Sequence, residues 1–122
     1  MFSNPQRRTD MAVQSLRREA GRYLRELRER KGLSQRQLAD LVGTEYYTFV
    51  SQLETGRGRI PPDKYEIWAE ALGIPTQEFV YHLLRYYDPV TFRLLFPENT
   101  AETPAVQGRA TGKVISIAEA NR

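Results

Sequence analysis

The segment Leu33–Pro62 contains two closely spaced sets of helix start and helix stop signals. Ser34 followed three residues later by Gln37 is a capping-box pattern, which predicts the start of a helix, and Gly43 ends that helix. A second short helix follows and ends before Gly56 and a loop with two arginines. Two short helices joined by a glycine-marked turn form a compact unit that presents the second helix toward a ligand. This segment therefore restricts the fold more than any other part of the chain.

Apolar residues at spacings of three and four continue the helical pattern on both sides of this segment, and they predict an all-α fold. Gly21 lies inside the first predicted helix, where glycine costs about 1 kcal/mol relative to alanine and allows a bend. The predicted helices run from Thr9 or Asp10 to Lys31, from a cap at Ser34 to Val42, from Tyr46 or Tyr47 to Glu54, from Pro62 to Leu72, from a cap at Thr76 to Tyr87, and from Pro89 to Leu95.

Composition divides the 122 residues into three parts, which is the organisation of one domain with tails. Residues 1–8 have no periodicity, and we expect a flexible arm there. Residues 9–97 carry the helical pattern and form the predicted domain with a C-terminal helical extension. Residues 98–122 are rich in Thr, Ala, Gly and Pro, so we expect a disordered tail. The short β-prone run Val114–Ile117 in this tail has no partner strand and is marginal as structure.

The residue types that most catalytic and metal sites need are scarce in this chain. It has no cysteine, so it has neither a disulfide framework nor a thiolate metal site. Its one histidine, His82, cannot build a histidine-based zinc site alone, and it is expected to be a surface or interface residue. The sequence shows no nucleophile with a neighbouring acid–base pair. We therefore expect neither an enzyme nor a bound cofactor or metal.

Basic residues gather in the first part of the chain. Residues 1–31 hold nine Arg or Lys against four Asp or Glu, residues 32–97 hold six against eight, and the formal net charge is +3. A basic region of this kind is compatible with a nucleic-acid partner. An ordinary solvated helix face would have the same composition, because acidic residues alternate with the arginines there. Charge alone leaves both interpretations open.

No segment of the sequence is typical of a membrane protein or of a secreted one. The chain contains no apolar run near the roughly 18 residues that a spanning helix needs. The first residues, MFSNPQRRTD, lack the apolar core of a signal peptide. We therefore expect a cytoplasmic protein without a membrane partner.

Three pieces of the sequence, in this order, resemble the phage repressor and Cro family, also called the xenobiotic-response-element family. They are LRELRERKGLSQRQLADLVG at Leu24–Gly43, FVSQLETG at Phe49–Gly56 and WAEALGI at Trp68–Ile74. The resemblance implies a five-helix, repressor-like helix-turn-helix domain, here with an extended first helix and a short sixth helix. It also implies a sequence-specific transcriptional regulator, repressor-like and nucleoid-associated, whose third helix reads the major groove of double-stranded DNA.

The resemblance also implies which residues of this chain contact DNA. The contacts come from the start of the second helix, the exposed side of the third helix and the loop after it: Ser34, Gln35, Tyr46, Tyr47, Thr48, Ser51, Gln52, Thr55, Arg57 and Arg59. The amide of Gln52 can bond adenine N6 and N7, and the loop arginines suit phosphates. Some family members pair an arginine of the first helix with a glutamate of the third, which here would be Arg28 with Glu54.

The turn before the third helix departs from the family pattern. Between Gly43 and the FVSQLE piece this chain has one residue more than the usual spacing. Either the third helix starts earlier or the turn bulges, and each arrangement rotates different side chains toward the bases. Tyr46 and Tyr47 can contact phosphates and sugars, or one of them can pack on the second helix.

The end of the helical region has more apolar bulk than a small bundle needs. Because family members usually bind pseudo-palindromic sites as dimers, we expect the fifth and sixth helices to form a homodimer interface through Phe79, Leu83, Tyr86, Tyr87, Phe92, Leu95 and Phe96. The alternative is that Phe92 and Phe96 fold back onto the core of a monomer.

A second function uses the same fold. Helix-turn-helix domains also serve as the DNA-binding antitoxins of toxin–antitoxin pairs and as adaptors that present a tail to another protein. Residues 98–122 could fold onto such a protein partner. A toxin-like reading frame beside the gene would favour the antitoxin interpretation.

Overall fold

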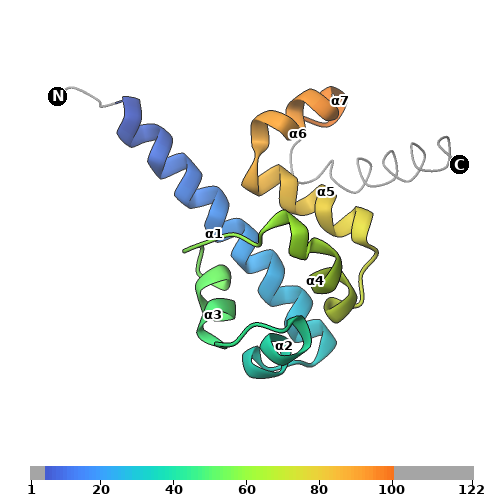
Figure 1. Ribbon diagram of the computed structural model, residues 1–122. Helices are drawn as coiled ribbons and strands as arrows, with labels where there is room; N and C mark the ends of the chain where they lie inside the picture. The colour runs from blue at the N-terminus through green and yellow to red at the C-terminus, as the bar shows by residue number, and fades with distance from the viewer. Residues whose placement is uncertain (1–4, 101–122) are drawn as a thin grey trace, which may run out of the picture. The chain divides into compact units, whose positions relative to one another are not determined.

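The computed structural model describes the backbone of residues 5–100 and the side chains of residues 10–99. Secondary structure in this part of the chain is helical throughout, which confirms the predicted all-α class. None of these helices is long and apolar enough to cross a membrane. Figure 1 labels the α-helices, whose bounds are α1 Pro5–Lys31, α2 Gln35–Val42, α3 Thr48–Glu54, α4 Tyr65–Leu72, α5 Thr76–Tyr87, α6 Pro89–Leu95 and α7 Pro97–Thr100, with a 3₁₀ turn η1 at Pro62–Lys64 before α4.

The helices form two compact units, Met1–Asp88 with α1 to α5 and Pro89–Arg122 with α6 and α7. In the second unit Phe92 is buried, and its ring lies 5.2 Å from that of Phe96. Residues 1–4 and 101–122 lie outside the described residues. The expected disordered tail begins at residue 98, but residues 98–100 belong to the helix α7, so the prediction is wrong there. The remainder of the tail, with the Val114–Ile117 run, falls outside the described part of the chain.

Four helix starts differ from the predictions: those of α1, α4 and α5, and that of α3, which begins at Thr48 rather than at Tyr46 or Tyr47. α1 begins at Pro5, because proline is tolerated in a first helical turn and Gln6 and the following arginines are good helix formers. Thr76 is the first residue of α5 rather than its cap, since Pro75 occupies the cap position without a side-chain bond. The start of the predicted fourth helix is the 3₁₀ turn η1, and α7 was not predicted.

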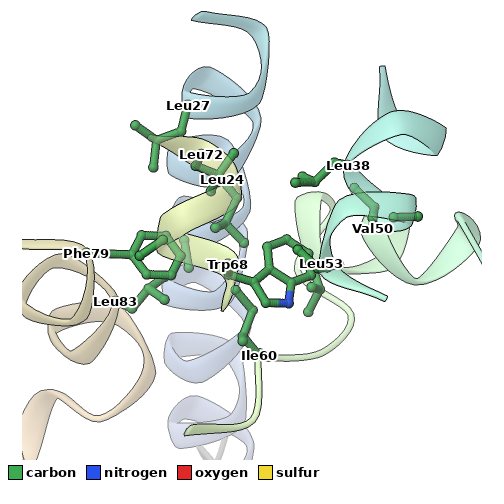
Figure 2. Packing of buried hydrophobic residues seen from close by; sticks show 14 of the residues in the cluster. Leu24, Leu27, Leu38, Val50, Leu53, Ile60, Trp68, Leu72, Phe79 and Leu83 are labelled. Carbon is green, nitrogen blue, oxygen red and sulfur yellow. The ribbon is translucent and has the colours of Figure 1, made fainter. Parts of the chain in front are cut away.

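One apolar core joins all five helices of the first unit, as Figure 2 shows. Trp68 of α4 is 2% exposed and Leu38 of α2 is fully buried. Burying a side chain of this size contributes about 1.5–3 kcal/mol each. The buried apolar residues of this core are Ala20, Leu24, Leu27, Leu38, Ala39, Val42, Val50, Leu53, Ile60, Trp68, Ala69, Leu72, Phe79, Leu83 and Tyr87.

The predicted dimer interface is wrong for four of its residues, one of which is Phe92 of the second unit, 3% exposed. Phe79 and Leu83 have no exposed surface and Tyr87 is 7% exposed, because all three face the core of their own chain. Tyr86 is half-buried and packs against that core, with its ring 6.4 Å from that of Tyr23. An apolar face on α5 looks the same in the sequence whether it meets a second copy or the neighbouring helices.

Candidate DNA-binding site

The start of α2 is fixed by the predicted capping box. The hydroxyl oxygen of Ser34 accepts a hydrogen bond from the Gln37 backbone N–H at 3.0 Å. The side-chain oxygen of Gln37 in turn accepts one from the Ser34 backbone N–H at 2.8 Å. Since Ser34 only accepts in this pair, its hydroxyl proton remains free to donate to an outside acceptor. Gly43 ends α2 with a positive φ of 74°, a conformation that costs glycine little.

A buried ion pair joins α1 to the end of α3. The guanidinium of Arg28 donates from Nε to Glu54 Oε2 at 2.6 Å and from Nη2 to Glu54 Oε1 at 3.1 Å. Its Nη1 donates to the Leu33 carbonyl at 2.7 Å. The hydrogen bond with the Glu54 carboxylate raises the pKa of Arg28. The pair that the family resemblance implied is therefore present, and it ties α3 to α1 and to the turn before α2.

Gln35 extends this cluster into α2. Its side-chain amide donates to Glu54 Oε1 at 3.1 Å, so the carboxylate receives bonds from two helices. One amide proton of Gln35 is thus directed inward rather than toward a ligand. Its second amide proton and its backbone N–H remain for an outside acceptor, because the first N–H groups of a helix have no partner within it.

The turn between α2 and α3 absorbs the extra residue. Tyr46 precedes α3, Tyr47 occupies the cap position without a side-chain cap bond, and the helix begins at Thr48. Of the two arrangements that the sequence left open, the structure therefore has the longer turn. Tyr46 is 66% exposed and Tyr47 is 45% exposed. Both tyrosines stand on the surface at the start of α3 rather than in the core.

Arg36 is a site residue that the sequence predictions missed. It is exposed in the first turn of α2, and its guanidinium carbon lies 4.9 Å from the centroid of the Tyr47 ring. This cation–π contact places a positive charge beside the start of α3. The only signal in the sequence was a basic residue next to Gln35. The sequence could not predict that Arg36 approaches the ring of Tyr47, because this contact depends on the length of the turn between α2 and α3.

The polar side chains on the outer side of α3 differ in whether their hydrogen-bonding groups are free to bind a ligand. Thr48 and Gln52 are exposed, and Ser51 is half-buried. The hydroxyl of Thr55 donates to the carbonyls of Ser51 at 3.0 Å and Gln52 at 3.1 Å. The hydroxyl proton of Thr55 is therefore donated within the chain, at the C-terminal end of α3. The amide of Gln52 makes no hydrogen bond among the described residues, which leaves both its donor and its acceptor available.

The two loop arginines after α3 differ in their surroundings. Arg57 is exposed, and its backbone N–H bonds the Gln52 carbonyl at 2.8 Å. Arg59 is half-buried, donates to the Tyr65 hydroxyl at 3.1 Å and lies 4.7 Å from the centroid of the Tyr87 ring. The loop thus presents one solvated cation and one cation held in place by two aromatic residues.

His82 packs against α1, with its ring centroid 5.1 Å from that of Tyr23. Burial lowers the pKa of His82, and Arg85 lowers it further, while Glu78 acts in the opposite direction. Because its folded pKa lies below the ordinary value, the unfolded chain binds more protons, and stability falls as the pH drops below about 6.5. Between about pH 7 and about pH 5.5, the free energy of unfolding should fall less in His82→Gln than in the parent. Urea unfolding of both proteins at both pH values would measure this difference. An identical pH dependence in both proteins would contradict the burial of this imidazole.

Residues 19–80, about half of the chain, match the family model of a helix-turn-helix domain. The solved structure of the restriction-modification controller protein C.AhdI from Aeromonas hydrophila is 37% identical over 53% of this chain and 96% of that one, with a TM-score of 0.47. No curated protein matches. The α2–turn–α3 geometry of this chain agrees with the family match. The chain belongs to the helix-turn-helix family of DNA-binding regulators, as the resemblance to phage repressors and Cro predicted.

Proposed function

We propose that this chain is a cytoplasmic, repressor-like transcriptional regulator that inserts α3 into the major groove of double-stranded DNA as a homodimer. The observation that carries the proposal is the two-sided character of α3. Val50, Leu53 and Glu54 are buried and fix the helix to its neighbours, while Thr48 and Gln52 face solvent. A short helix that is rigidly held and polar on its outer side fits the role of a recognition helix.

Base recognition is assigned to the exposed side of α3. The major groove is about 12 Å wide and admits one helix. Gln52 presents an amide whose donor and acceptor match N7 and N6 of adenine. Thr48, one turn earlier, can contact a thymine methyl group. Tyr46 and Tyr47 at the start of the helix bring two hydroxyl groups within reach of sugar and phosphate.

Backbone contacts are assigned to the start of α2 and to the loop after α3. Ser34 has a free hydroxyl proton, and the N–H groups at the start of α2 favour an anion. Arg36 and Arg57 add positive charge near the start and after the end of α3. Thr55 is left out of the proposed contacts because its hydroxyl proton is already donated within the chain.

Selection of bound sequences from a random pool of duplex DNA tests the whole proposal. We expect a pseudo-palindromic consensus, because two copies of α3 in a symmetric dimer read two equivalent half-sites. The spacing of the half-sites would be close to one helical turn, about 34–36 Å. Enrichment of no sequence over the starting pool would contradict sequence-specific binding.

Replacing Gln52 should change the selectivity of the protein. In Gln52→Ala we expect the binding free energy for the selected sequence to weaken by about 1–3 kcal/mol. At one position of each half-site, all four bases should then be bound almost equally well. Affinity for random DNA should stay at the parental value, because this amide contributes no charge. Competition assays with single-base variants of the site would measure both quantities. A uniform loss on every sequence would show that Gln52 does not read a base.

Replacing Arg57 should weaken binding without changing selectivity. In Arg57→Gln the slope of log affinity against log salt concentration should decrease in magnitude by about 0.9, on the selected site and on random DNA alike. The matched control is Arg25→Gln on α1, whose side chain already pairs with Glu29 at 3.0 Å. An unchanged slope in Arg57→Gln would remove this residue from the phosphate contacts.

The dimer interface is now proposed at the second unit. Leu94 and Leu95 of α6 are 72% and 60% exposed, so two neighbouring apolar side chains are available to a second copy of the chain. We expect the parent protein to be dimeric in light scattering at micromolar concentration. Leu94→Asp with Leu95→Asp should shift it to monomer mass. A monomeric parent would contradict the dimer proposal while leaving the assignment of α3 intact.

A further inference from the structure

Two arginines from distant parts of the chain share one aromatic ring. The guanidinium carbon of Arg59 lies 4.7 Å from the centroid of Tyr87, and that of Arg17 on α1 lies 5.6 Å from the same centroid. Tyr87 is itself held firmly, because it is 7% exposed and its hydroxyl oxygen accepts from the Ile60 backbone N–H at 3.3 Å. The ring therefore fixes two positive charges close to each other.

Neither charge is neutralised within the described residues. The ion pairs found there join Arg25 to Glu29 and Arg28 to Glu54, and they include neither Arg17 nor Arg59. The Nε of Arg17 is shielded from solvent and has no hydrogen-bond partner in the described structure. Placing two cations side by side without a carboxylate costs free energy, because like charges repel. An anion from outside the chain would remove this cost.

Close backbone packing places these residues at the end of α3. Gly56 has a φ of 84°, and a Cβ atom there would lie 2.8 Å from the Arg18 backbone nitrogen. The loop after α3 thus lies directly against α1 at Arg18. This contact brings the loop that carries Arg57 and Arg59 beside Arg17 and Arg18 of α1. The cluster lies at the C-terminal end of the helix to which we assign base reading.

We propose that Arg17 is a DNA-backbone ligand, which binds a phosphodiester beside the one bound by Arg59 and extends the DNA contact onto α1. This inference rests on the proposed function and deepens it. Arg17 precedes residues 19–80, the part of the chain that matches the helix-turn-helix model. The contact would therefore lie outside the segment that matches the family model.

The dimensions of duplex DNA fit this assignment. The two guanidinium carbons cannot lie farther apart than the sum of their distances to the shared centroid. Successive phosphates of one strand advance about 3.4 Å along the helix axis and also turn about it, so a span within this limit reaches two neighbouring phosphates. Arginine suits such sites because its planar group stacks on a ring and still donates toward a phosphate.

The test is the salt dependence of DNA binding in the parent protein and three variants of it. In Arg17→Gln the slope of log affinity against log salt should decrease in magnitude by about 0.9, equally on the selected site and on random duplex DNA. Arg17→Lys keeps the charge and should retain the parental slope. The matched control is Arg22→Gln, an exposed arginine of α1 that lies outside this cluster and should also retain it. Thermal unfolding of each variant, followed by circular dichroism, confirms that all are folded at the assay temperature.

The outcomes separate this inference from the proposed function. If the parent binds DNA and Arg17→Gln keeps the parental slope, the assignment of Arg17 is overturned and the assignment of α3 stands. If Arg17→Lys loses as much slope as Arg17→Gln, the effect is structural and the assignment is again overturned. If the parent binds no duplex DNA, the proposed function and this inference fail together.

Discussion

Glu54→Ala is expected to lower the free energy of unfolding by about 3–5 kcal/mol, the usual effect of breaking a buried ion pair by removing one partner. The Glu54 side chain is 4% exposed and that of Arg28 is 11% exposed, so the variant leaves a guanidinium almost without water or counter-charge. It also removes the acceptor of the Gln35 amide. Urea unfolding monitored by circular dichroism would measure the loss.

The control for this prediction is an ion pair of the same chemistry on the surface. Arg25 and Glu29 are 62% and 55% exposed, and exposed pairs contribute about 0–1 kcal/mol. Arg25→Ala should therefore change stability little. The double variant Arg28→Met with Glu54→Met should recover part of the loss, because it leaves no buried charge unpaired. If Glu54→Ala and Arg25→Ala were equally mild, the Arg28–Glu54 pair would not be buried as described.

The same pair connects stability to the proposed function. Arg28, Gln35 and Glu54 belong to α1, α2 and α3, and their bonds hold the end of α3 against the other two helices. The double methionine variant keeps the volume but loses the directed hydrogen bonds. This variant separates the role of the pair in stability from its role in positioning α3. A folded variant with weakened DNA binding would show that the hydrogen bonds position α3 for the major groove.

Local signals predicted most of the fold correctly. The end of α2 at Gly43 and the end of α4 at Gly73 follow from glycines with positive φ, and the start of α2 follows from the capping box at Ser34. These features depend on neighbours within four residues, so the sequence contains all the information needed. The apolar residues that are buried on α4, Trp68, Ala69 and Leu72, likewise follow the helical spacing of three and four.

Features that depend on distant residues could not be predicted in this way. The sequence offered no reason for Arg59 and Arg17 to meet at Tyr87, because the three residues come from α1, a loop and α5. It also could not tell a core face from an interface face on α5, which is why Phe79 was assigned to a dimer. Both cases require knowledge of which helix packs against which.

Gly21→Ala is the second variant with a large expected effect, although replacing glycine by alanine normally stabilises a helix by about 1 kcal/mol. A Cβ atom at Gly21 would collide with the Glu54 backbone carbonyl, and it would lie 2.7 Å from the Leu53 carbonyl oxygen. Backbone atoms cannot rotate away, so α1 and α3 must separate. Overpacking of this kind costs about 1–3 kcal/mol, and we expect the upper end of that range here, a net loss near 2 kcal/mol.

Gly58→Ala provides the matched control in the same domain. Gly58 has no positive φ, and a Cβ there would meet only the end of the Leu53 side chain at an ordinary 3.7 Å. This variant should be neutral or slightly stabilising, because alanine has less freedom in the unfolded chain. The two proteins should then differ by roughly 8–16 °C in Tm, given about 4–8 °C per kcal/mol for a domain of this size. A stabilised Gly21→Ala would mean that α1 and α3 do not approach each other as closely as the Arg28–Glu54 pair requires.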